Sequence, residues 1–266
     1  MNEFLLSTRH ICKTYPATRK TGQAEVLRNI SMDVREKEFI VILGNSGCGK
    51  STYLKILAGI EEATSGSIEL AGKDHGRKLS RDALRDFGYV FQSNNLLQWR
   101  TAAGNLRFNL EVMGLKGEKW DARVEEMLRI VGLQDYMNIY PHELSGGMRQ
   151  RVGIARAMVH DPKILIFDQP LGALDAITRK MLSYEILNIW EKTQKTIIMV
   201  TNNVDEALLL ANRIFVFSPL PGSIVREIPV DIPLEERTLS INELPHYQSL
   251  RREINALIRS FGGANK

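Results

Sequence analysis

The feature that most constrains this chain is a glycine-rich segment placed directly after a strand-like apolar run. Residues 44–51 read Gly-Asn-Ser-Gly-Cys-Gly-Lys-Ser, and they follow the continuous apolar run Phe39–Leu43. The next residues, Thr52–Leu57, can open a helix. A glycine-rich turn in this context aims successive backbone N–H groups at one point, and the helix N-terminus adds partial positive charge there. The segment therefore predicts a phosphate-binding loop.

The side chains of this loop fit a nucleoside triphosphate with its Mg²⁺ ion. Lys50 would reach the β- and γ-phosphates, and Ser51 would place its hydroxyl on Mg²⁺. The remaining phosphate-binding candidates are the other loop residues and the residue that follows the loop, namely Gly44, Asn45, Ser46, Gly47, Cys48, Gly49 and Thr52. The alternative is a glycine-rich turn without a ligand, in which Cys48 only fills space.

A second segment, Ile164–Asp168, complements the loop. Four apolar residues end in Asp168, which predicts a carboxylate at the C-terminal tip of a buried strand. In a parallel sheet this is the edge where ligands bind, and the carboxylate can hold Mg²⁺ through water. Many buried strands end in Asp, so this segment indicates a Mg²⁺ site only in combination with the phosphate-binding loop earlier in the chain.

The apolar pattern predicts an α/β fold with a mainly parallel core sheet, because buried strands alternate with helical periodicity. Alternation at Ile30, Met32 and Val34 predicts antiparallel strands near the N-terminus. Residues of about 93–160 show no buried strand and predict a helical insertion. We expect one domain over 1–218 and a C-terminal extension over 219–266. This extension ends in an amphipathic helix that carries Leu250, Ile254, Leu257, Ile258 and Phe261. We expect that helix to cover the core; a membrane-surface or regulatory role is the alternative.

Composition excludes an integral membrane protein, a disulfide-rich secreted module and a disordered tail protein. The 266 residues are 44% hydrophobic and 25% charged, and apolar runs stop after four or five residues, whereas a membrane-spanning helix needs about 20. The N-terminus lacks the basic start and apolar stretch of a signal peptide. Two cysteines, Cys12 and Cys48, are too few for a disulfide framework, which favours a reducing cytoplasm.

The segment Leu144–Gln150, Leu-Ser-Gly-Gly-Met-Arg-Gln, resembles the signature motif of ATP-binding-cassette (ABC) ATPases. Ser145 with the amides of Gly146 and Gly147 at a helix start would form a second anion cradle. The resemblance implies that this cradle caps the γ-phosphate of an ATP bound to the other subunit of a dimer.

Further segments resemble ABC elements in the same order along residues 4–220. Tyr15 resembles the aromatic residue that stacks on adenine, Gln92 the Q-loop glutamine that reaches Mg²⁺, and 173–175 the D-loop. The resemblance implies ATP and Mg²⁺ as ligands. It also implies a P-loop ATPase fold with an N-terminal antiparallel β subdomain and a helical insertion subdomain.

A narrower resemblance is to importer ATPases of the nitrate/sulfonate/taurine group. It rests on 96–101, Leu-Leu-Gln-Trp-Arg-Thr, on 221–225, Pro-Gly-Ser-Ile-Val, and on Ile228–Arg237. Trp99 could instead be interior packing, and Arg100 a surface charge.

The resemblance implies three partners: a second ABC ATPase subunit in a homo- or heterodimer, transmembrane permease subunits, and indirectly an extracytoplasmic solute-binding protein. It implies a peripheral place on the cytoplasmic face of the membrane, and we expect no nucleic acid partner. The net charge of +4 is then assigned to phosphate contacts and an anionic bilayer face. A soluble ABC ATPase acting on nucleic acid or ribosomes, and a regulatory ATP-binding cassette, are the alternatives.

Two catalytic positions depart from the ABC pattern. Gln169 stands where the family usually has the glutamate that accepts a proton from water, and Asn202 stands where it has the switch histidine; Asn203 replaces a frequent Asp. Glutamine cannot take a proton near neutral pH, and a missing general base typically costs about 10²–10⁴ in rate. We expect this site to bind ATP and hydrolyse it slowly.

Three explanations for the departures compete: an engineered trap, a degenerate site in an asymmetric heterodimer, and a homodimer with altered geometry. A trap does not explain Asn202, so we favour a natural departure and leave the choice of dimer open.

Overall fold

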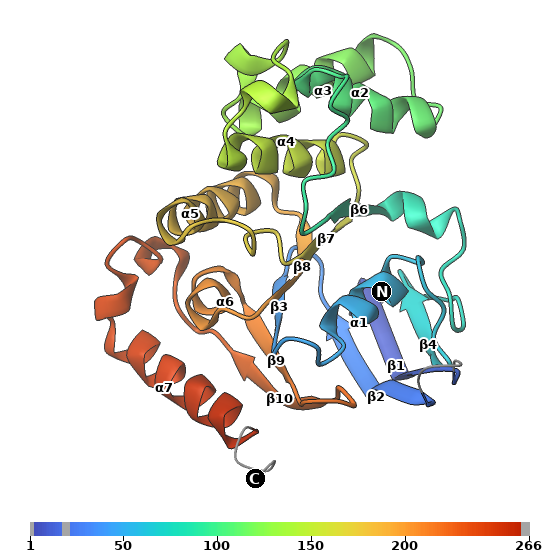
Figure 1. The fold of residues 1–266 in the computed structure, drawn as a ribbon, viewed down its shortest axis with the longest axis vertical. Helices are drawn as coiled ribbons and strands as arrows, with labels where there is room; N and C mark the ends of the chain where they lie inside the picture. Colours follow the sequence, from blue (N-terminus) through green and yellow to red (C-terminus); the bar gives the residue numbers. More distant parts are fainter. Residues whose placement is uncertain (1–2, 18–21, 262–266) are drawn as a thin grey trace. The chain divides into compact units, whose positions relative to one another are not determined.

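The computed structural model describes residues 3–17 and 22–261, and its chain forms two compact units (Figure 1). The first unit contains Met1–Leu84 and Thr196–Lys266, and the second contains Arg85–Lys195.

The first unit begins with an antiparallel sheet. Its strands are β1 (Leu6–Tyr15), β2 (Ala24–Val34), β4 (Ser65–Leu70) and β5 (Lys73–Asp74), in the order β2-β1-β4-β5. Ile30, Met32 and Val34 are buried on β2, while the residues between them are not. The alternating sequence pattern therefore correctly predicted half-buried antiparallel strands.

The parallel strands of this unit are buried on both faces. In β3 (Phe39–Leu43) all five residues are buried. It pairs in parallel with β8 (Thr196–Thr201) and with β9 (Arg213–Phe217), and β10 (Ile224–Pro229) adds to β9 antiparallel. Continuous apolar runs are typical of such strands, because neither face meets water. The expected parallel core is confirmed.

Three α-helices of the first unit bear on the candidate site. Helix α1 (Lys50–Leu57) begins two residues earlier than the sequence predicted, because the left-handed Gly49 ends the loop and Lys50 is already helical. Helix α6 (Val204–Leu210) follows β8, and α7 (Pro245–Ser260) packs against α6.

The side chains of α7 follow the expected amphipathic pattern. Leu250 and Ile254 are buried, while Leu257, Ile258 and Phe261 are half-buried. On the other side of the contact, Asp205 of α6 accepts a hydrogen bond from Tyr247 at 2.8 Å and pairs with Arg251 at 2.7 Å. The domain boundary expected at residue 218 stays a prediction.

The second unit contains the parallel strands β6 (Phe87–Val90) and β7 (Ile164–Asp168) with helices α2 (Ala102–Val112), α3 (Glu118–Ile130), α4 (Gly146–Met158) and α5 (Ala176–Thr193). Residues 93–160 hold helices and no strand, as the missing buried pattern predicted. Helix α3 buries Val124, Met127 and Leu128 and is followed by left-handed Gly132. Within the described residues, no helix is both long and apolar enough to cross a membrane.

His160 ties three elements of the second unit together. Its Nε2 faces the Phe87 carbonyl at 3.1 Å, and its Nδ1 faces the amide nitrogen of Asn109 at 3.1 Å. That amide also donates to the Arg156 carbonyl at 3.0 Å. A carbonyl only accepts, so the proton sits on Nε2 and Nδ1 accepts. Burial lowers the pKa of His160 below its ordinary value, and the carbonyl of Phe87 opposes this shift only in part.

We expect acidification to destabilise the second unit through His160. The folded pKa lies below the unfolded value of about 6.5, so the unfolded chain binds the proton first as pH falls. The contribution of His160 to the free energy of unfolding should therefore be constant well above pH 6.5, and it should decrease as the pH drops towards the folded pKa. Chemical denaturation of His160→Gln between pH 7.5 and 5.5 should show a smaller pH slope than the parent. The exposed His246→Gln should keep the parental slope, and equal slopes in all three proteins would contradict the assignment.

Candidate functional site

The segment after β3 forms a tight loop whose backbone requires glycine. Gly47 and Gly49 have φ of 81° and 97°, in the left-handed region. At Gly49 a Cβ atom would lie 2.8 Å from Cδ2 of Leu27 and 2.9 Å from the carbonyl oxygen of Val26. Any side chain there would strain the backbone and displace β2, so both the conformation and the space select glycine.

Lys50 is held across this loop. The side chain is only 3% exposed, and Nζ donates to the carbonyl oxygens of Gly44 and Asn45, each at 2.8 Å. The hydrogen-bond ladder of α1 starts with the Tyr53 N–H on the Gly49 carbonyl at 3.0 Å, so the helix N-terminus opens onto the loop. A buried ammonium and a helix N-terminus at one loop form a site for an anion.

The structure brings Asn202 to the same loop. Its Nδ2 donates to Oγ of Ser46 at 3.1 Å, although the two residues lie far apart in the sequence. The next residue, Asn203, caps α6: its Oδ1 accepts the N–H groups of Asp205 and Glu206 at 2.8 and 3.2 Å. An asparagine caps a helix as well as the aspartate that the family often has there.

Tyr15 lies at the end of β1 in the same unit. Its hydroxyl donates to the carboxylate of Glu61, and Nζ of Lys13 lies 4.9 Å from the ring centroid. Burial and then Glu61 raise the pKa of Tyr15, so the phenol stays neutral. Stacking of this ring on adenine stays a prediction.

In the second unit, three candidates gather where β6 and β7 end. Asp168 is the last residue of β7 and accepts a hydrogen bond from the Tyr89 hydroxyl at 3.1 Å. Gln169 adopts a φ of 47°, a conformation that is uncommon outside glycine and that concentrates at functional sites. A Cβ at Gly172 would lie 3.6 Å from Nε2 of Gln92 and 3.7 Å from Cβ of Gln169, so both side chains border this glycine.

The signature-like segment forms the helix cap that the sequence predicted. Ser145 precedes α4, and its Oγ accepts the Met148 N–H at 3.2 Å. A Cβ at Gly147 would lie 3.5 Å from Cγ2 of Thr178, so the N-terminus of α4 packs beside that of α5. Asp175 caps α5 by accepting the N–H groups of Ile177 and Thr178, and the bonds from Thr178 lower the pKa of its carboxyl.

Comparison with known proteins identifies the family. The family model described as ABC transporter matches residues 27–172, which is more than half of the chain and includes the glycine-rich loop, the signature-like segment and Asp168. The chain belongs to the ABC transporter family.

Curated ABC relatives align along nearly their whole length. The taurine import ATP-binding protein TauB of Rhizobium johnstonii is 40% identical over 248 residues, covering 92% of this chain and 93% of the relative. The nitrate import ATP-binding protein NrtD of a Synechocystis species is 38% identical over 245 residues, covering 90% of each. The aliphatic sulfonates import ATP-binding protein SsuB of Bacillus cereus is 38% identical over 237 residues, covering 89% of this chain and 90% of the relative.

Solved structures agree with the ABC fold. The dimeric post-hydrolysis state of the ATP-binding cassette MJ0796 bound to ADP and Pi matches with a TM-score of 0.71 and 30% identity, covering 86% of this chain and all of that one. The expected α/β fold of an ABC cassette is therefore confirmed, with its parallel core, antiparallel β part and helical insertion.

The donor set fits Mg²⁺ better than a metal held by protein alone. In the second unit, Gln92 and Asp168 offer amide and carboxylate oxygens, and in the first unit Ser51 offers a hydroxyl; all are hard ligands of the kind that Mg²⁺ prefers. Among the described residues, no three His, Cys, Asp or Glu side chains cluster as a metal site. Mg²⁺ usually combines one or two carboxylates with phosphate oxygens and water, which these residues allow.

The exposure of Trp99 in the structure tests the alternative that this residue packs in the interior. Trp99 is 74% exposed, so the interior-packing interpretation of this residue is wrong, while Arg100 pairs with Glu111 at 2.9 Å.

The sequence did not indicate that Tyr89 belongs to the candidate site. Its position is informative only when β6 and β7 are known to be neighbours, because nothing near Tyr89 in the sequence marks it.

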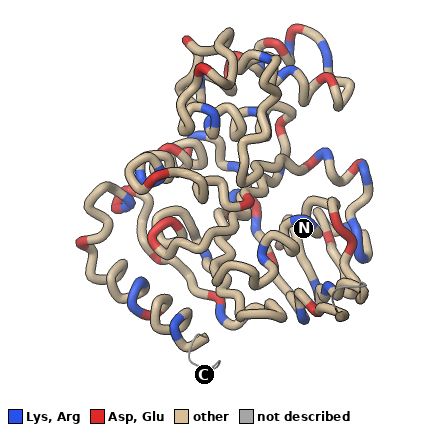
Figure 2. Tube along the Cα trace, viewed as in Figure 1, with Lys and Arg blue, Asp and Glu red and all other residues tan. Residues whose placement is uncertain are grey.

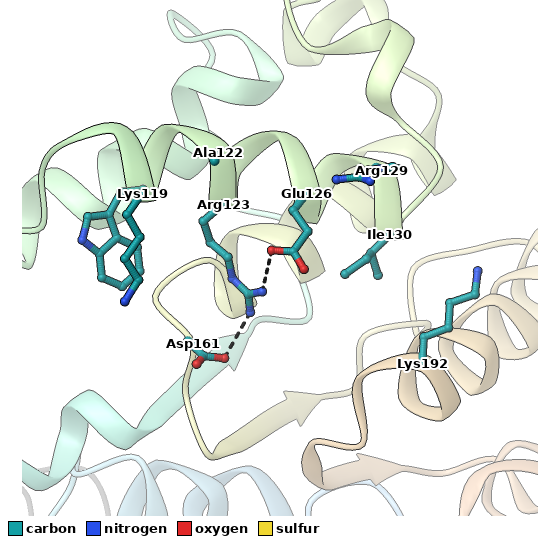
Figure 3. A pocket seen from close by; sticks show the side chains of 9 residues that line it. Lys119, Ala122, Arg123, Glu126, Arg129, Ile130, Asp161 and Lys192 are labelled. Carbon is teal, nitrogen blue, oxygen red and sulfur yellow. Dashed lines mark hydrogen bonds and ion pairs between the residues drawn. The ribbon is translucent and has the colours of Figure 1, made fainter.

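A cavity of about 660 Å³ in the second unit lies along α3 and is shown in Figure 3. None of the predicted site residues lines it. Its Arg123 pairs with Glu126 at 2.8 Å and with Asp161 at 3.1 Å. The pair with Asp161 joins α3 to the turn before β7, a structural role that requires no ligand.

Proposed function

We propose that this chain is the ATP-binding subunit of an importer for a small solute of the taurine, sulfonate or nitrate type. The observation that carries the proposal is alignment with three import ATP-binding proteins over about nine-tenths of both chains, together with a phosphate-binding loop and a signature helix cap on one polypeptide. This subunit would not touch the solute, so its site residues carry no solute specificity.

ATP would bind with its phosphates on residues Gly44–Thr52. Lys50 would leave its two carbonyl acceptors for phosphate oxygens, which offer a charged partner in place of neutral ones. Ser51, Gln92 and Asp168 would hold Mg²⁺, which neutralises phosphate charge when bound. Ser145, Gly146 and Gly147 would cap the γ-phosphate of an ATP held by a second ABC cassette, so that two chains close around two nucleotides.

A groove in the second unit offers a docking place for a permease subunit. It has a volume of about 370 Å³. Apolar side chains of the segment after β6 and of α2 with its C-cap line it, namely Phe91, Leu97, Phe108 and Met113, together with polar ones that include Asn95, Arg156 and His160. Trp99 and Val112, on the same two segments, are strongly exposed. An exposed apolar surface of this kind is typical of a protein contact. Docking there would place the chain on the cytoplasmic face of the membrane, and a solute-binding protein would act from the other side.

The alternative of nucleic acid binding has less support. Figure 2 shows Lys and Arg interspersed with Asp and Glu along the described chain, whereas nucleic acid binding favours basic residues clustered on one face.

Co-purification and transport test the proposal. The chain would be co-expressed with the membrane proteins encoded beside its gene, purified in detergent, and reconstituted with the neighbouring solute-binding protein. We expect a stable membrane complex and ATP-dependent uptake of labelled taurine, alkanesulfonate or nitrate. The Lys50→Ala variant should still assemble into the complex but should lose uptake. Recovery of salt-sensitive RNA or DNA without a membrane subunit would overturn the proposal, and uptake that tolerates Lys50→Ala would indicate a regulatory cassette instead.

A further inference from the structure

Tyr89 links the groove of the second unit to the carboxylate at the end of β7. Its hydroxyl donates to Oδ2 of Asp168 at 3.1 Å, and Tyr89 also lines the groove proposed for permease docking. There it packs against the ring of Phe91, with the centroids 4.4 Å apart and the planes inclined at 41°. One side chain therefore touches both the proposed permease-docking groove and the carboxylate expected at Mg²⁺.

The strand register explains why the two side chains meet. β6 and β7 are parallel, and Tyr89 pairs with Ile166. Successive side chains on a strand alternate between faces, so Asp168, two residues after Ile166, lies on the same face as Tyr89. The bond is thus built into the pairing of two strands.

The hydroxyl is a permanent donor. An ionised carboxylate can only accept, so the phenol proton of Tyr89 points to Oδ2 of Asp168 and orients that carboxylate.

The backbone around Tyr89 leaves little room for β6 itself to move. A Cβ at Gly88 would lie 2.2 Å from the carbonyl oxygen of Ala157, so β6 packs directly on the backbone of α4. An occupant of the groove would meet the side chains of Tyr89 and Phe91 rather than displace the strand. Rotation of the Tyr89 side chain about its Cα–Cβ bond would then move the hydroxyl relative to Asp168.

We propose that Tyr89 is a positioning residue that couples the groove to Asp168: occupation of the groove sets the orientation of the carboxylate and hence the binding of Mg²⁺. The coupling rests on the proposed permease contact, whereas the positioning of Asp168 does not. The competing interpretation is that Tyr89 only fills space, and the Tyr89→Phe variant separates the two because it keeps the ring and removes the hydroxyl.

Mg²⁺ titration of nucleotide binding tests the positioning without any turnover. A fluorescent ATP analogue would be bound to the purified chain at increasing Mg²⁺ concentrations. For Tyr89→Phe we expect the half-saturating Mg²⁺ concentration to rise about tenfold or more, since losing a group that orients a metal ligand typically costs 10- to 100-fold. Binding without Mg²⁺ should not change. Tyr136→Phe, the same substitution at an exposed tyrosine of the same unit, should behave as the parent.

The coupling is tested in the membrane complex. We expect the permease to stimulate ATPase activity less in Tyr89→Phe than in the parent at saturating Mg²⁺, with equal amounts of permease bound. An unchanged Mg²⁺ titration would overturn the positioning role, and unchanged stimulation in a complex that assembles would overturn the coupling. If the parental chain assembles no membrane complex, the proposed function fails and the coupling fails with it, while the Mg²⁺ titration still decides the role of Tyr89.

Discussion

Replacing Gln169 by glutamate is expected to raise the ATP turnover of the chain by about 10²- to 10⁴-fold, the usual contribution of a general base. Gln169 directly follows Asp168 and borders Gly172 together with Gln92. Glutamine and glutamate have nearly the same shape, so the substitution leaves the left-handed backbone at this position unchanged and adds only a proton acceptor. Phosphate release from Mg-ATP, measured beside the parent, gives the ratio.

Gln194→Glu is a matched control for this experiment. Gln194 is an exposed residue of the same unit and has a φ of 50°, close to the 47° of Gln169, but it lies at the C-terminal end of α5. The control introduces the same charge in a similar backbone conformation away from the site, and turnover should stay at the parental level. Equal turnover in Gln169→Glu and the parent would show that Gln169 does not limit hydrolysis.

Replacing Arg237 by methionine is expected to lower the free energy of unfolding by about 3 kcal/mol, because buried acceptors lose a charged donor. Arg237 is 4% exposed, and its guanidinium donates to the carbonyl oxygens of Ile232, Leu209 and Val230 at 3.1, 3.0 and 3.4 Å. Burial lowers the pKa of Arg237 to about 10, so the group is cationic at neutral pH.

These bonds tie residues 230–237 to α6, the helix that begins just after Asn202. Arg237→Lys keeps the charge without the planar fork and should lose part of this stability. Arg252→Met, an exposed arginine on α7, should stay within about 0.5 kcal/mol of the parent in urea denaturation. Equal stability of Arg237→Met and Arg252→Met would contradict the role assigned to the buried guanidinium.

The sequence predicted those parts of the molecule that depend on local rules. β3 and its glycine loop are contiguous, and the loop needs positive φ, so glycine spacing marks it before any tertiary contact is known. The same holds for Ser145, because an N-cap bond reaches only three residues along the chain. The sequence placed the start of α1 two residues too late, because the left-handed conformation of Gly49, and not residue preference, decides where that helix begins.

Contacts between distant segments could not be predicted in the same way. Asn202 reaches Ser46, Tyr89 reaches Asp168 and Arg237 reaches Leu209, each across a strand pairing or a helix packing. Polar side chains on separate elements show no periodic spacing in the sequence, so no sequence pattern predicts which of them will be in contact.

By itself the sequence determined the ABC family, the phosphate-binding loop, the signature cap and the unusual Gln169 and Asn202, because each is a matter of residue type at a fixed local spacing. Only the tertiary structure decided that Trp99 is exposed, that Tyr89 holds Asp168 and that Arg237 fastens the C-terminal segment. The physical reason is that exposure and long-range hydrogen bonds depend on which surfaces the packed elements cover, and that is settled when strands pair and helices dock.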